Sequence, residues 1–496
     1  MREARIVLTT FNARYSHPAL GLRYLLANLG DLQPAARLLE FEIKADPAAA
    51  AQQILDLAPQ IVGLGVYIWN VPRIETLAAY LKAERPDLVL VLGGPEIGPE
   101  TEQQPLGKWA DYLVCGEADL AFPALCRDLL AGRPPPHRLI RASPADPAQL
   151  ALPDAFYSED DLAHKNVYVE SSRGCPFLCD YCLSAGDAPV RFFPLDRVME
   201  SLQRLLERGA LRFKFVDRTF NLQMDRCRVL LSFFLERLRP GLFVHFEMVP
   251  DILPDELGHL LARFPAGSLQ LEIGVQTFNP TVAERIHRRL DPEAVEQNLR
   301  FLREQTKAIL HTDLIAGLPG ENLDSFAAGF NRLLGLDSHK IQVGILKKLR
   351  GAPISRHTEA WRMEYNERPP YEVLSTSVAS REEVVKLKRF SRYWELITHH
   401  DRFPQTAPLL WEGSDSPFVA FLEASEWLFT RFGRDHSLPL LDLSEGLFDF
   451  LTTVRGFPPK ALAERMLHEY QAPGRHDVPP FLHRGNRTSE PLVPTD

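Results

Sequence analysis

Three of the six cysteines in this 496-residue sequence fall within one short segment, at Cys175, Cys179 and Cys182. Cysteine thiolates are ligands of zinc and of iron–sulfur clusters. A structural zinc site takes four ligands, and the other cysteines are distant in the sequence, although His164 could serve as the fourth. A four-iron cluster held by three thiolates leaves one iron open to a further ligand. The spacing therefore favours a reactive cluster over a zinc site or three unrelated core thiols.

The cysteines follow an apolar, β-rich run at residues 166–172, where a region of alternating strands and helices begins. Five later runs have the composition of strands, and segments of helical periodicity separate them. These strands are expected at residues 211–217, 242–250, 268–275, 308–317 and 339–349. Six strand–helix units predict a partial, TIM-like (β/α)6 barrel over residues 166–354. Its chemistry is expected at the carboxyl ends of the strands.

Residues 1–135 also alternate strands with helices. Five short runs rich in Val, Ile, Leu and aromatic residues are expected to form a parallel sheet covered by helices on both faces. This pattern predicts an α/β domain of flavodoxin-like, Rossmann-like type, whose ligands bind outside the carboxyl ends of the strands. Residues 136–165 are polar and contain several prolines, which predicts a linker between this domain and the barrel.

The strand signal fades after the barrel. Residues 355–480 contain amphipathic runs that predict a helical C-terminal domain, and the polar, Pro-rich residues 481–496 predict a disordered tail. Within this part, RPPYEVLSTS (368–377) contains two adjacent prolines. They favour a rigid turn at a helix entry over a role for Tyr371 and Glu372 in the site.

The overall composition excludes several classes of protein. A net charge of −9 and a pI near 6.0 give no strong signal for binding nucleic acid through a basic surface. No apolar run reaches the roughly 18 residues of a membrane span, and the short apolar run after the N-terminal charges favours a buried strand over a signal peptide. Six cysteines in a chain of this length do not indicate a disulfide framework. We therefore expect a cytoplasmic protein in a reducing compartment, not bound to a membrane.

The segment SSRGCPFLCDYC (171–182) resembles the cluster loop of the radical S-adenosylmethionine (SAM) superfamily. In that family three cysteines hold a [4Fe-4S] cluster, whose open iron binds S-adenosyl-L-methionine. The reduced cluster cleaves SAM and yields a 5′-deoxyadenosyl radical. The resemblance implies that Cys175, Cys179 and Cys182 are the iron ligands and that Tyr181 lies against the adenine of SAM.

Three further segments extend this resemblance in the same order along the chain: LEIGVQTFN (271–279), TDLIAGLPGE (312–321) and LKKLRGAPI (346–354). Each segment alone could be an ordinary strand end or strand-to-helix turn. Their order and spacing make the resemblance specific. It implies SAM contacts from a small set of residues: Glu272, Gly274, Gln276 and Gly317.

An α/β domain ahead of such a barrel resembles the cobalamin-binding (B12-binding) domain of cobalamin-dependent radical SAM enzymes. The matching loops are residues 9–25, 65–70, 93–98 and 115–119, all at the carboxyl edge of the expected sheet. A sheet kept only for packing is the alternative. The resemblance implies cobalamin contacts from Asn12, Tyr67, Trp69, Asn70, Gly93, Gly94, Pro95, Glu96, Gly116 and Glu117. The C-terminal part resembles an uncharacterised domain that accompanies some of these enzymes.

The first of these loops lacks one feature of other cobalamin proteins. Classical cobalamin-dependent mutases and methyltransferases carry an Asp-x-His-x-x-Gly motif whose histidine ligates cobalt. Here His17 is present, but Tyr15 stands where the aspartate would be. We interpret His17 as a residue at a helix entry. A side chain from the 65–70 loop would then cover the lower face of cobalt.

The resemblance implies methyl transfer through cobalamin to an unactivated carbon of a small-molecule or peptide substrate, with an external electron donor such as flavodoxin or ferredoxin. The alternatives are a cobalamin-dependent radical rearrangement or cyclisation, a methylthiotransferase of RNA or protein, and a non-catalytic cobalamin or redox sensor. A methylthiotransferase would need a second three-cysteine cluster, and only Cys115 and Cys126 lie in the N-terminal domain. No residue is identified for proton transfer. Asp217 and Asn221 are expected near the cofactor, without an assigned role.

Overall fold

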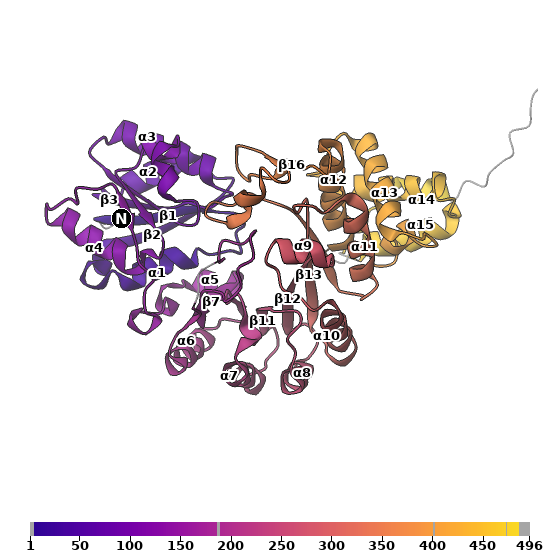
Figure 1. Ribbon diagram of the computed structural model, residues 1–496, viewed down its shortest axis with the longest axis horizontal. Helices are drawn as coiled ribbons and strands as arrows, with labels where there is room; N and C mark the ends of the chain where they lie inside the picture. Colours follow the sequence, from indigo (N-terminus) through magenta and orange to yellow (C-terminus); the bar gives the residue numbers. More distant parts are fainter. Residues whose placement is uncertain (1–3, 186–188, 400–401, 473, 486–496) are drawn as a thin grey trace, which may run out of the picture.

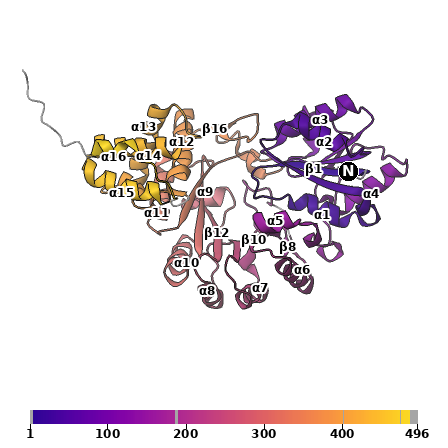
Figure 2. The same ribbon diagram turned by 180° about the vertical axis from the view of Figure 1, so that it is seen from behind.

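The structure is a computed structural model that describes residues 4–185, 189–399, 402–472 and 474–485. An N-terminal α/β domain and a C-terminal helical domain lie on either side of a central barrel-like sheet (Figure 1). The view from behind shows the same arrangement (Figure 2). No helix among the described residues has the length and apolar character needed to cross a membrane.

The N-terminal sheet has six parallel strands in the order β2-β1-β3-β4-β5-β6. The strands are β1 (Ile6–Asn12), β2 (Ala36–Glu42), β3 (Ile61–Gly65), β4 (Val89–Gly93), β5 (Tyr112–Cys115) and β6 (Leu139–Arg141). Helices α1 (Leu20–Asn28) and α4 (Ala118–Leu130) cover one face, and α2 (Pro47–Leu55) and α3 (Val71–Glu84) cover the other. Because helices cover both faces, side chains on both sides of the central strands β1 and β3 are buried, and these strands are largely apolar. This arrangement confirms the predicted class of fold.

The sixth strand differs from the sequence expectation. Residues 139–141, expected in a linker, pair in parallel with β5 and complete the sheet. The rest of the expected linker includes α5 (Glu159–His164), whose Ser158 caps the helix. Strand β6 has only three residues and follows three prolines, so it carries little of the composition by which strands are recognised.

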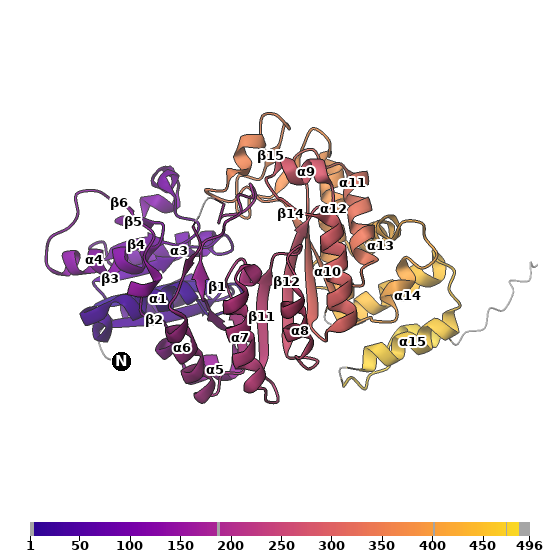
Figure 3. The same ribbon diagram turned by 60° about the horizontal axis from the view of Figure 1, so that its bottom comes forward.

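The central sheet has six parallel strands in the order β14-β13-β12-β11-β10-β7, so the predicted partial barrel is present. The strands are β7 (Val167–Val169), β10 (Arg212–Phe215), β11 (Phe243–Met248), β12 (Leu269–Gln276), β13 (Ile309–Ala316) and β14 (Lys340–Ile345). The helices on its outer face include α6 (Leu195–Glu207), α7 (Met224–Glu236), α8 (Asp255–Ala262), α10 (Pro292–Gln305) and α11 (Leu323–Leu334), several of which Figure 3 shows beside the strands.

Burial alternates along the barrel strands, and this alternation positions the site. In β12 the residues Leu269, Leu271, Ile273 and Val275 are buried beneath the helices. The residues between them are polar or small and only half buried. Because successive side chains of a strand point to opposite faces, Glu272, Gly274 and Gln276 share the face opposite the helices.

The C-terminal domain contains α12 (Arg381–Thr398), α13 (Pro417–Phe432), α14 (Leu440–Thr453) and α15 (Pro459–Gln471). Helix α12 covers the edge strand β14, and Trp394 donates a hydrogen bond from Nε1 to the backbone oxygen of Ile341 at 2.9 Å. A short helix, α16 (Pro480–Gly485), follows, so the expected disordered tail does not begin at residue 481. Residues 486–496 lie outside the described part of the chain.

Residues 346–380 connect β14 to α12, and we call residues 346–376 of this connection the strap. It contains the short antiparallel pair β15 (Glu364–Tyr365) and β16 (Val373–Ser375). The two prolines of RPPYEVLSTS were expected at a helix entry, but α12 begins only at Arg381. Figure 1 shows the strap as the orange segment that crosses between the N-terminal domain and the helical domain.

A buried ion-pair cluster joins the N-terminal domain to the segment before the barrel. Arg23 of α1 is 2% exposed and lies 2.6 Å from Glu40 of β2 and 2.7 Å from Asp161 of α5. Its guanidinium also lies over the ring of Tyr157, 4.8 Å from the centroid. The N-terminal sheet is therefore tied to residues well beyond its own last strand.

Candidate functional site

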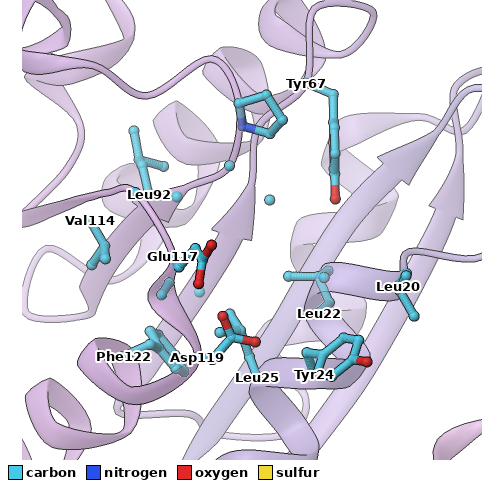
Figure 4. A pocket seen from close by; sticks show the side chains of 18 of the residues that line it. Leu20, Leu22, Tyr24, Leu25, Tyr67, Leu92, Val114, Glu117, Asp119 and Phe122 are labelled. Carbon is cyan, nitrogen blue, oxygen red and sulfur yellow. The ribbon is translucent and has the colours of Figure 1, made fainter. Parts of the chain in front are cut away.

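A cavity of about 470 Å³ opens at the carboxyl edge of the N-terminal sheet. Side chains of α1 form one wall, and side chains of β4, β5 and α4 form the other (Figure 4). The apolar part of the lining is Leu20, Leu22, Leu25, Leu92, Val114 and Phe122. This is the place where the sequence predicted a ligand.

Glycines keep this cavity open. A Cβ at Gly63 would lie 2.8 Å from Leu8 Cδ2 and 3.0 Å from the ring of Phe122. Gly94 has a φ of +109°, and its Cβ would lie 2.6 Å from the backbone oxygen of Val66. Side chains at these positions would fill the cavity floor or displace the backbone around it.

Tyr67 lies two residues after the end of β3, and its side chain lines the cavity (Figure 4). Burial raises the pKa of its hydroxyl to about 12, so the group stays protonated. The ring is stacked on Trp69, with centroids 4.6 Å apart. Asn70 fixes this turn, because its side chain accepts a hydrogen bond from the backbone N–H of Tyr67 and donates to Thr10 and Phe11.

Charged side chains gather where this cavity faces the barrel. Arg173 lies 2.8 Å from Asp119, 2.7 Å from Glu170 and 3.5 Å from Glu117. Arg191 also pairs with Glu117. Burial would raise the pKa of Glu117, but these two guanidiniums hold it below its usual value. Since Arg173 is two residues before the first cysteine of the motif, the cavity and the cysteine loop share a wall.

A second cavity, of about 210 Å³, lies at the carboxyl ends of the barrel strands. Its lining includes Cys175, Cys179, Cys182 and Tyr181, so the four motif residues do converge. Burial, together with the two neighbouring thiols, raises the pKa of Cys175. Among the described residues, no group of three or more His, Cys, Asp or Glu side chains is arranged to hold a single metal ion.

Strand β12 contributes three residues to the same cavity: Glu272, Gly274 and Gln276. Burial alone would raise the pKa of Glu272, but His245, 2.9 Å away, and Lys214, 3.3 Å away, hold it at about 2. Gln276 has a φ of +71° at a register shift between β12 and β13. Glu272 is therefore an ionised hydrogen-bond acceptor at neutral pH.

Four charged residues line the second cavity without having been predicted: Arg218, Glu247, Arg288 and Asp313. Arg288 lies 3.9 Å from the sulfur of Cys179 and donates to the backbone oxygen of Gly274 at 2.5 Å. Burial raises the pKa of Asp313 well above its usual value. The alternation of polar and apolar residues in β11 and β13 was the signal for Glu247 and Asp313, whereas nothing in the sequence marked Arg218 or Arg288.

Arg218 is the residue that the two cavities have in common. It follows β10, and its nearest carboxylate is that of Glu247, at 3.5 Å. Its side chain is half exposed. A molecule bound beside Arg218 would be in reach of both cavities.

Several residues that the sequence singled out lie elsewhere. Asn12, Trp69, Asn70 and Glu96 are outside the lining of the first cavity, and Gly317 is outside that of the second. Asn12 donates to Glu40, and Trp69 donates to the backbone oxygen of Phe11. The remaining predicted residues of the first cavity, Tyr67, Gly93, Gly94, Pro95, Gly116 and Glu117, all line it.

Three other residues considered from the sequence have structural partners. Asp217 accepts hydrogen bonds from the backbone N–H of Ser171 and from the hydroxyls of Ser171 and Ser172, and so fixes the start of the cysteine loop. Asn221 bonds to backbone groups of the β11–α8 loop. His17 is outside the cavity lining and packs against the ring of Tyr168.

Both cavities suit the groups that the sequence implied. The first is apolar and floored by glycines, which suits a large, flat ligand laid close to the backbone. The second offers three thiols around an open space, which suits a cluster larger than a single ion. Its ionised Glu272 can accept hydrogen bonds from hydroxyl groups such as those of a ribose.

Family models match three consecutive parts of the chain. The B12 binding domain matches residues 6–126, the radical SAM superfamily matches residues 169–332, and a protein family of unknown function, DUF4080, matches residues 359–491. The first two matches cover five of the six strands of the first sheet and most of the barrel. The third includes the end of the strap and the helical domain.

Curated relatives agree with these matches at low identity. A 2-(S-pantetheinyl)-carbapenam-3-carboxylate methyltransferase of Streptantibioticus cattleyicolor is 26% identical over 60% of this chain and 48% of its own length. TokK of Streptomyces tokunonensis, a cobalamin-dependent radical SAM methyltransferase, is 24% identical over 64% of this chain and 52% of its own. The chain thus spans about half the length of these relatives. A ribosomal protein uS12 methylthiotransferase of Trichlorobacter lovleyi is 27% identical over 35% of this chain and 42% of its own.

Solved structures share the fold across nearly the whole chain. The cobalamin-dependent SAM radical enzyme OxsB, solved with aqua-cobalamin and SAM, superposes with a TM-score of 0.63 over 97% of this chain and 83% of its own, at 13% identity. The radical SAM methyltransferase TsrM of Kitasatospora setae, solved with cobalamin and a [4Fe-4S] cluster, gives 0.60 over 95% of this chain and 100% of its own, at 17% identity. The chain is therefore similar to proteins that join a B12-binding domain to a radical SAM domain, and its C-terminal part matches the DUF4080 family.

Proposed function

We propose that this chain is a cobalamin-dependent radical SAM enzyme that transfers a methyl group to an unactivated carbon of a small-molecule or peptide substrate. The observation that carries the proposal is the meeting of the two cavities at Arg218. A substrate held there would have cobalamin on one side and SAM on the other. Such a placement is what a reaction shared by two cofactors requires.

Cys175, Cys179 and Cys182 would hold the [4Fe-4S] cluster, and the cavity of the N-terminal domain would hold cobalamin. When bound, cobalamin supplies methyl transfer at cobalt, and the reduced cluster supplies the one-electron cleavage of SAM. The protein binds and orients these groups and keeps water from them. With a ligand bound, the apolar side chains of α1 and β4 would leave little room for water in the first cavity.

On the barrel side, the protein's own residues would orient SAM. Glu272 stays ionised and can accept hydrogen bonds from the ribose hydroxyls. Arg288 holds the end of β12 close to the cysteine loop through Gly274 and Cys179. Burial of Asp313 favours its protonated form, in which it can donate a hydrogen bond.

An external one-electron donor, such as a flavodoxin or ferredoxin, is part of this proposal, and so is a reducing cytoplasm in which thiols remain free. The cysteine loop is accessible from outside, because Leu178 and Leu183 are 54% and 40% exposed. A donor that contacts these side chains would come close to the cluster.

Methylthiotransferase activity is less well supported. It would need a second set of three cysteines, and the first 165 residues contain only Cys115 and Cys126. Cys126 is fully buried between α4 and the sheet. The methylthiotransferase relative also matches a smaller share of this chain than the two methyltransferases do.

The test needs no known substrate. The protein is purified without oxygen, reconstituted with iron, sulfide and hydroxocobalamin, desalted, and given SAM and a strong reductant. We expect retained cobalamin, 5′-deoxyadenosine that depends on the three cysteines, and S-adenosylhomocysteine that appears only with cobalamin. The control is the Cys175→Ala/Cys179→Ala/Cys182→Ala variant. Loss of cobalamin on desalting, with neither product formed, would contradict the proposal.

A further inference from the structure

The strap contacts both cofactor regions within a short stretch of sequence. It leaves β14 at the carboxyl edge of the barrel and contacts the loop that follows β4 in the N-terminal domain. Arg350 points its guanidinium to that loop. The guanidinium of Arg356 and the imidazole of His357 point to the cysteine loop. Six positions separate Arg350 from Arg356.

The first attachment is at Glu96, which follows the cavity-lining residues Gly93, Gly94 and Pro95. Glu96 is 3% exposed and accepts hydrogen bonds from Arg350 Nε and from the Tyr371 hydroxyl, both at 3.1 Å. Arg350 also donates to the Tyr371 oxygen at 2.8 Å. Both partners of this buried carboxylate therefore come from the strap.

The second attachment is at Asp180, which lies between Cys179 and Tyr181 and is fully buried. Its carboxylate accepts hydrogen bonds from Arg356 Nε at 2.8 Å and from His357 Nε2 at 2.7 Å. His287 lies beside the same carboxylate, at 3.4 Å. Here too, the strap supplies most of the hydrogen-bond partners of an acid that has no contact with water.

These contacts differ from ordinary surface ion pairs. Removing one partner of a buried, paired carboxylate leaves a charge without compensation, which is far more costly than breaking an exposed pair. Each acid therefore holds its end of the strap in place. When the strap is fixed at Glu96, Arg356 and His357 are held close to Asp180. When it is fixed at Asp180, Arg350 and Tyr371 are held close to Glu96.

We propose that the strap links the two cofactor sites, so that filling the cobalamin cavity stabilises the cysteine loop and a cluster in the cysteine loop favours cobalamin binding. A bound ligand orders the 93–95 backbone and thereby positions Glu96. Linkage between two binding events is reciprocal by thermodynamic necessity. Arg350, Tyr371, Arg356 and His357 are then positioning residues, which do not themselves touch the reacting atoms. The inference rests on the proposed function, because it assumes that both cofactors bind.

The experiment measures this linkage without using catalysis. Cluster-loaded protein is mixed with an iron chelator, with and without hydroxocobalamin, and iron release is followed by absorbance. In the wild type we expect cobalamin to slow release at least about fivefold, the lower end of common coupling strengths. In Arg350→Gln we expect a ratio near one. Tyr371→Phe, which removes a single hydroxyl and poses little risk to folding, should give an intermediate ratio.

The matched control is Arg381→Gln. Arg381 pairs with Glu364 of the strap at 2.7 Å, but both side chains are about 60% exposed and neither reaches a cofactor loop. This variant should keep the wild-type ratio. Hydrogen exchange of peptides covering residues 174–183 gives a second readout: cobalamin should slow their exchange in the wild type and in Arg381→Gln, but not in Arg350→Gln.

The possible failures are distinguishable. If both cofactors bind the wild type but cobalamin leaves iron release and exchange unchanged, the strap is only a static fastening and the inference is wrong. It is equally wrong if Arg350→Gln and Tyr371→Phe both keep the wild-type ratio. If the wild type retains neither cofactor, the proposed function fails, and the inference fails with it.

Discussion

The two cavities are built by different means. The cavity of the N-terminal domain is defined by what is missing: Gly63 and Gly94 leave space for a ligand, and the rest of the wall is largely apolar. The cavity of the barrel is defined by what is present: three thiols, two guanidiniums and three carboxylic acids. The first selects its ligand by shape, and the second by coordination and charge.

This difference determines which changes should damage each site. Adding a single carbon should be enough to impair the first cavity, whereas the second should tolerate changes in size better than changes in functional group. The direct effects on the two cavities should also be separable, because a change in one cavity leaves the lining of the other intact and reaches it only through the strap. Arg218 and Arg173, which belong to the boundary, are the exceptions.

The largest effect is expected from Cys175→Ala. Loss of one of three thiolates should prevent stable cluster binding and abolish 5′-deoxyadenosine formation. Cobalamin should still bind because the lining of the first cavity is unchanged, and its affinity should fall only by the amount that the linkage through the strap contributes. Bound iron and cobalamin are measured on the same sample. Cys115→Ala, at a half-buried free thiol outside both linings, is the control and should retain both. Loss of iron in both variants would mean that Cys175 has no special role.

The next largest effect is expected from Glu272→Gln. An ionised acceptor is replaced by a neutral amide, and a hydrogen bond to a charged group contributes about 1.5–3 kcal/mol, or roughly 10- to 150-fold in affinity. SAM binding, measured by equilibrium dialysis on cluster-loaded protein, should weaken accordingly, with iron and cobalamin contents unchanged. Glu256→Gln, at an exposed ion pair on α8, should bind SAM normally. Unaltered SAM affinity in Glu272→Gln would remove Glu272 from the site.

A smaller effect is expected from Gly94→Ala. The added Cβ would lie 2.6 Å from a backbone oxygen, and an alanine at a φ of +109° is strained by about 1–2 kcal/mol. Cobalamin retention should fall severalfold, because the clash displaces the backbone of residues that line the cavity, while iron stays bound. Gly132→Ala carries a comparable backbone strain, at a φ of +72°, but has nothing within 4 Å and should retain cobalamin. If both variants behave alike, strain rather than shape is responsible.

The last expected effect is on folding stability and leaves both cofactor sites unchanged. It concerns pH and Glu321, in the turn after β13. Burial raises its pKa from 4.5 to about 7, although Thr277 and Ser325 donate hydrogen bonds to it. Below about pH 4.5 Glu321 is protonated in both the folded and the unfolded chain. Its burial then adds no pH-dependent cost to the free energy of folding. Between 4.5 and 7 the unfolded chain releases the proton first, so stability falls as pH rises, by about 3 kcal/mol at most.

Glu321→Gln does not titrate, so its thermal midpoint should rise relative to the wild type between pH 5 and 7 and then stay level. Glu304→Gln, at an exposed position on α10, should show no such trend. A constant difference between Glu321→Gln and the wild type across this range would show that the acid is ionised throughout.

Most of the fold could be predicted from sequence because it depends on local composition. Strands such as β1 and β4 are nearly continuous apolar runs, and α12 and α13 have clear helical periodicity. Strand β6 was missed because three residues after a run of prolines gain their strand character only from pairing with β5. The helix entry predicted at residues 368–377 is wrong, because the two prolines lie between two short antiparallel strands.

The sites divide in the same way. The cysteines, Tyr181 and Glu272 lie in contiguous motifs, and the structure brings them to one cavity. Glu96 lies in an equally clear loop, but its carboxylate accepts a hydrogen bond from Arg350, 254 positions away, and does not line the cavity. Gly63 stands in the middle of a strand, where its role depends on Leu8 and Phe122 from other elements. Contacts of this kind follow from tertiary packing, which no local pattern encodes.

The buried cluster around Arg23 bears on how this protein can be divided or recombined. A fragment that stopped after the last helix of the N-terminal domain, at Leu130, would leave the Arg23 guanidinium without Asp161 and the ring of Tyr157. It would also expose the edge of β5 that β6 now covers. An autonomous cobalamin-carrying fragment should therefore extend to about residue 165. A chimera that exchanges the first domain must exchange α5 with it. The segment that has to be transferred as one unit is therefore longer than the segment that forms the sheet.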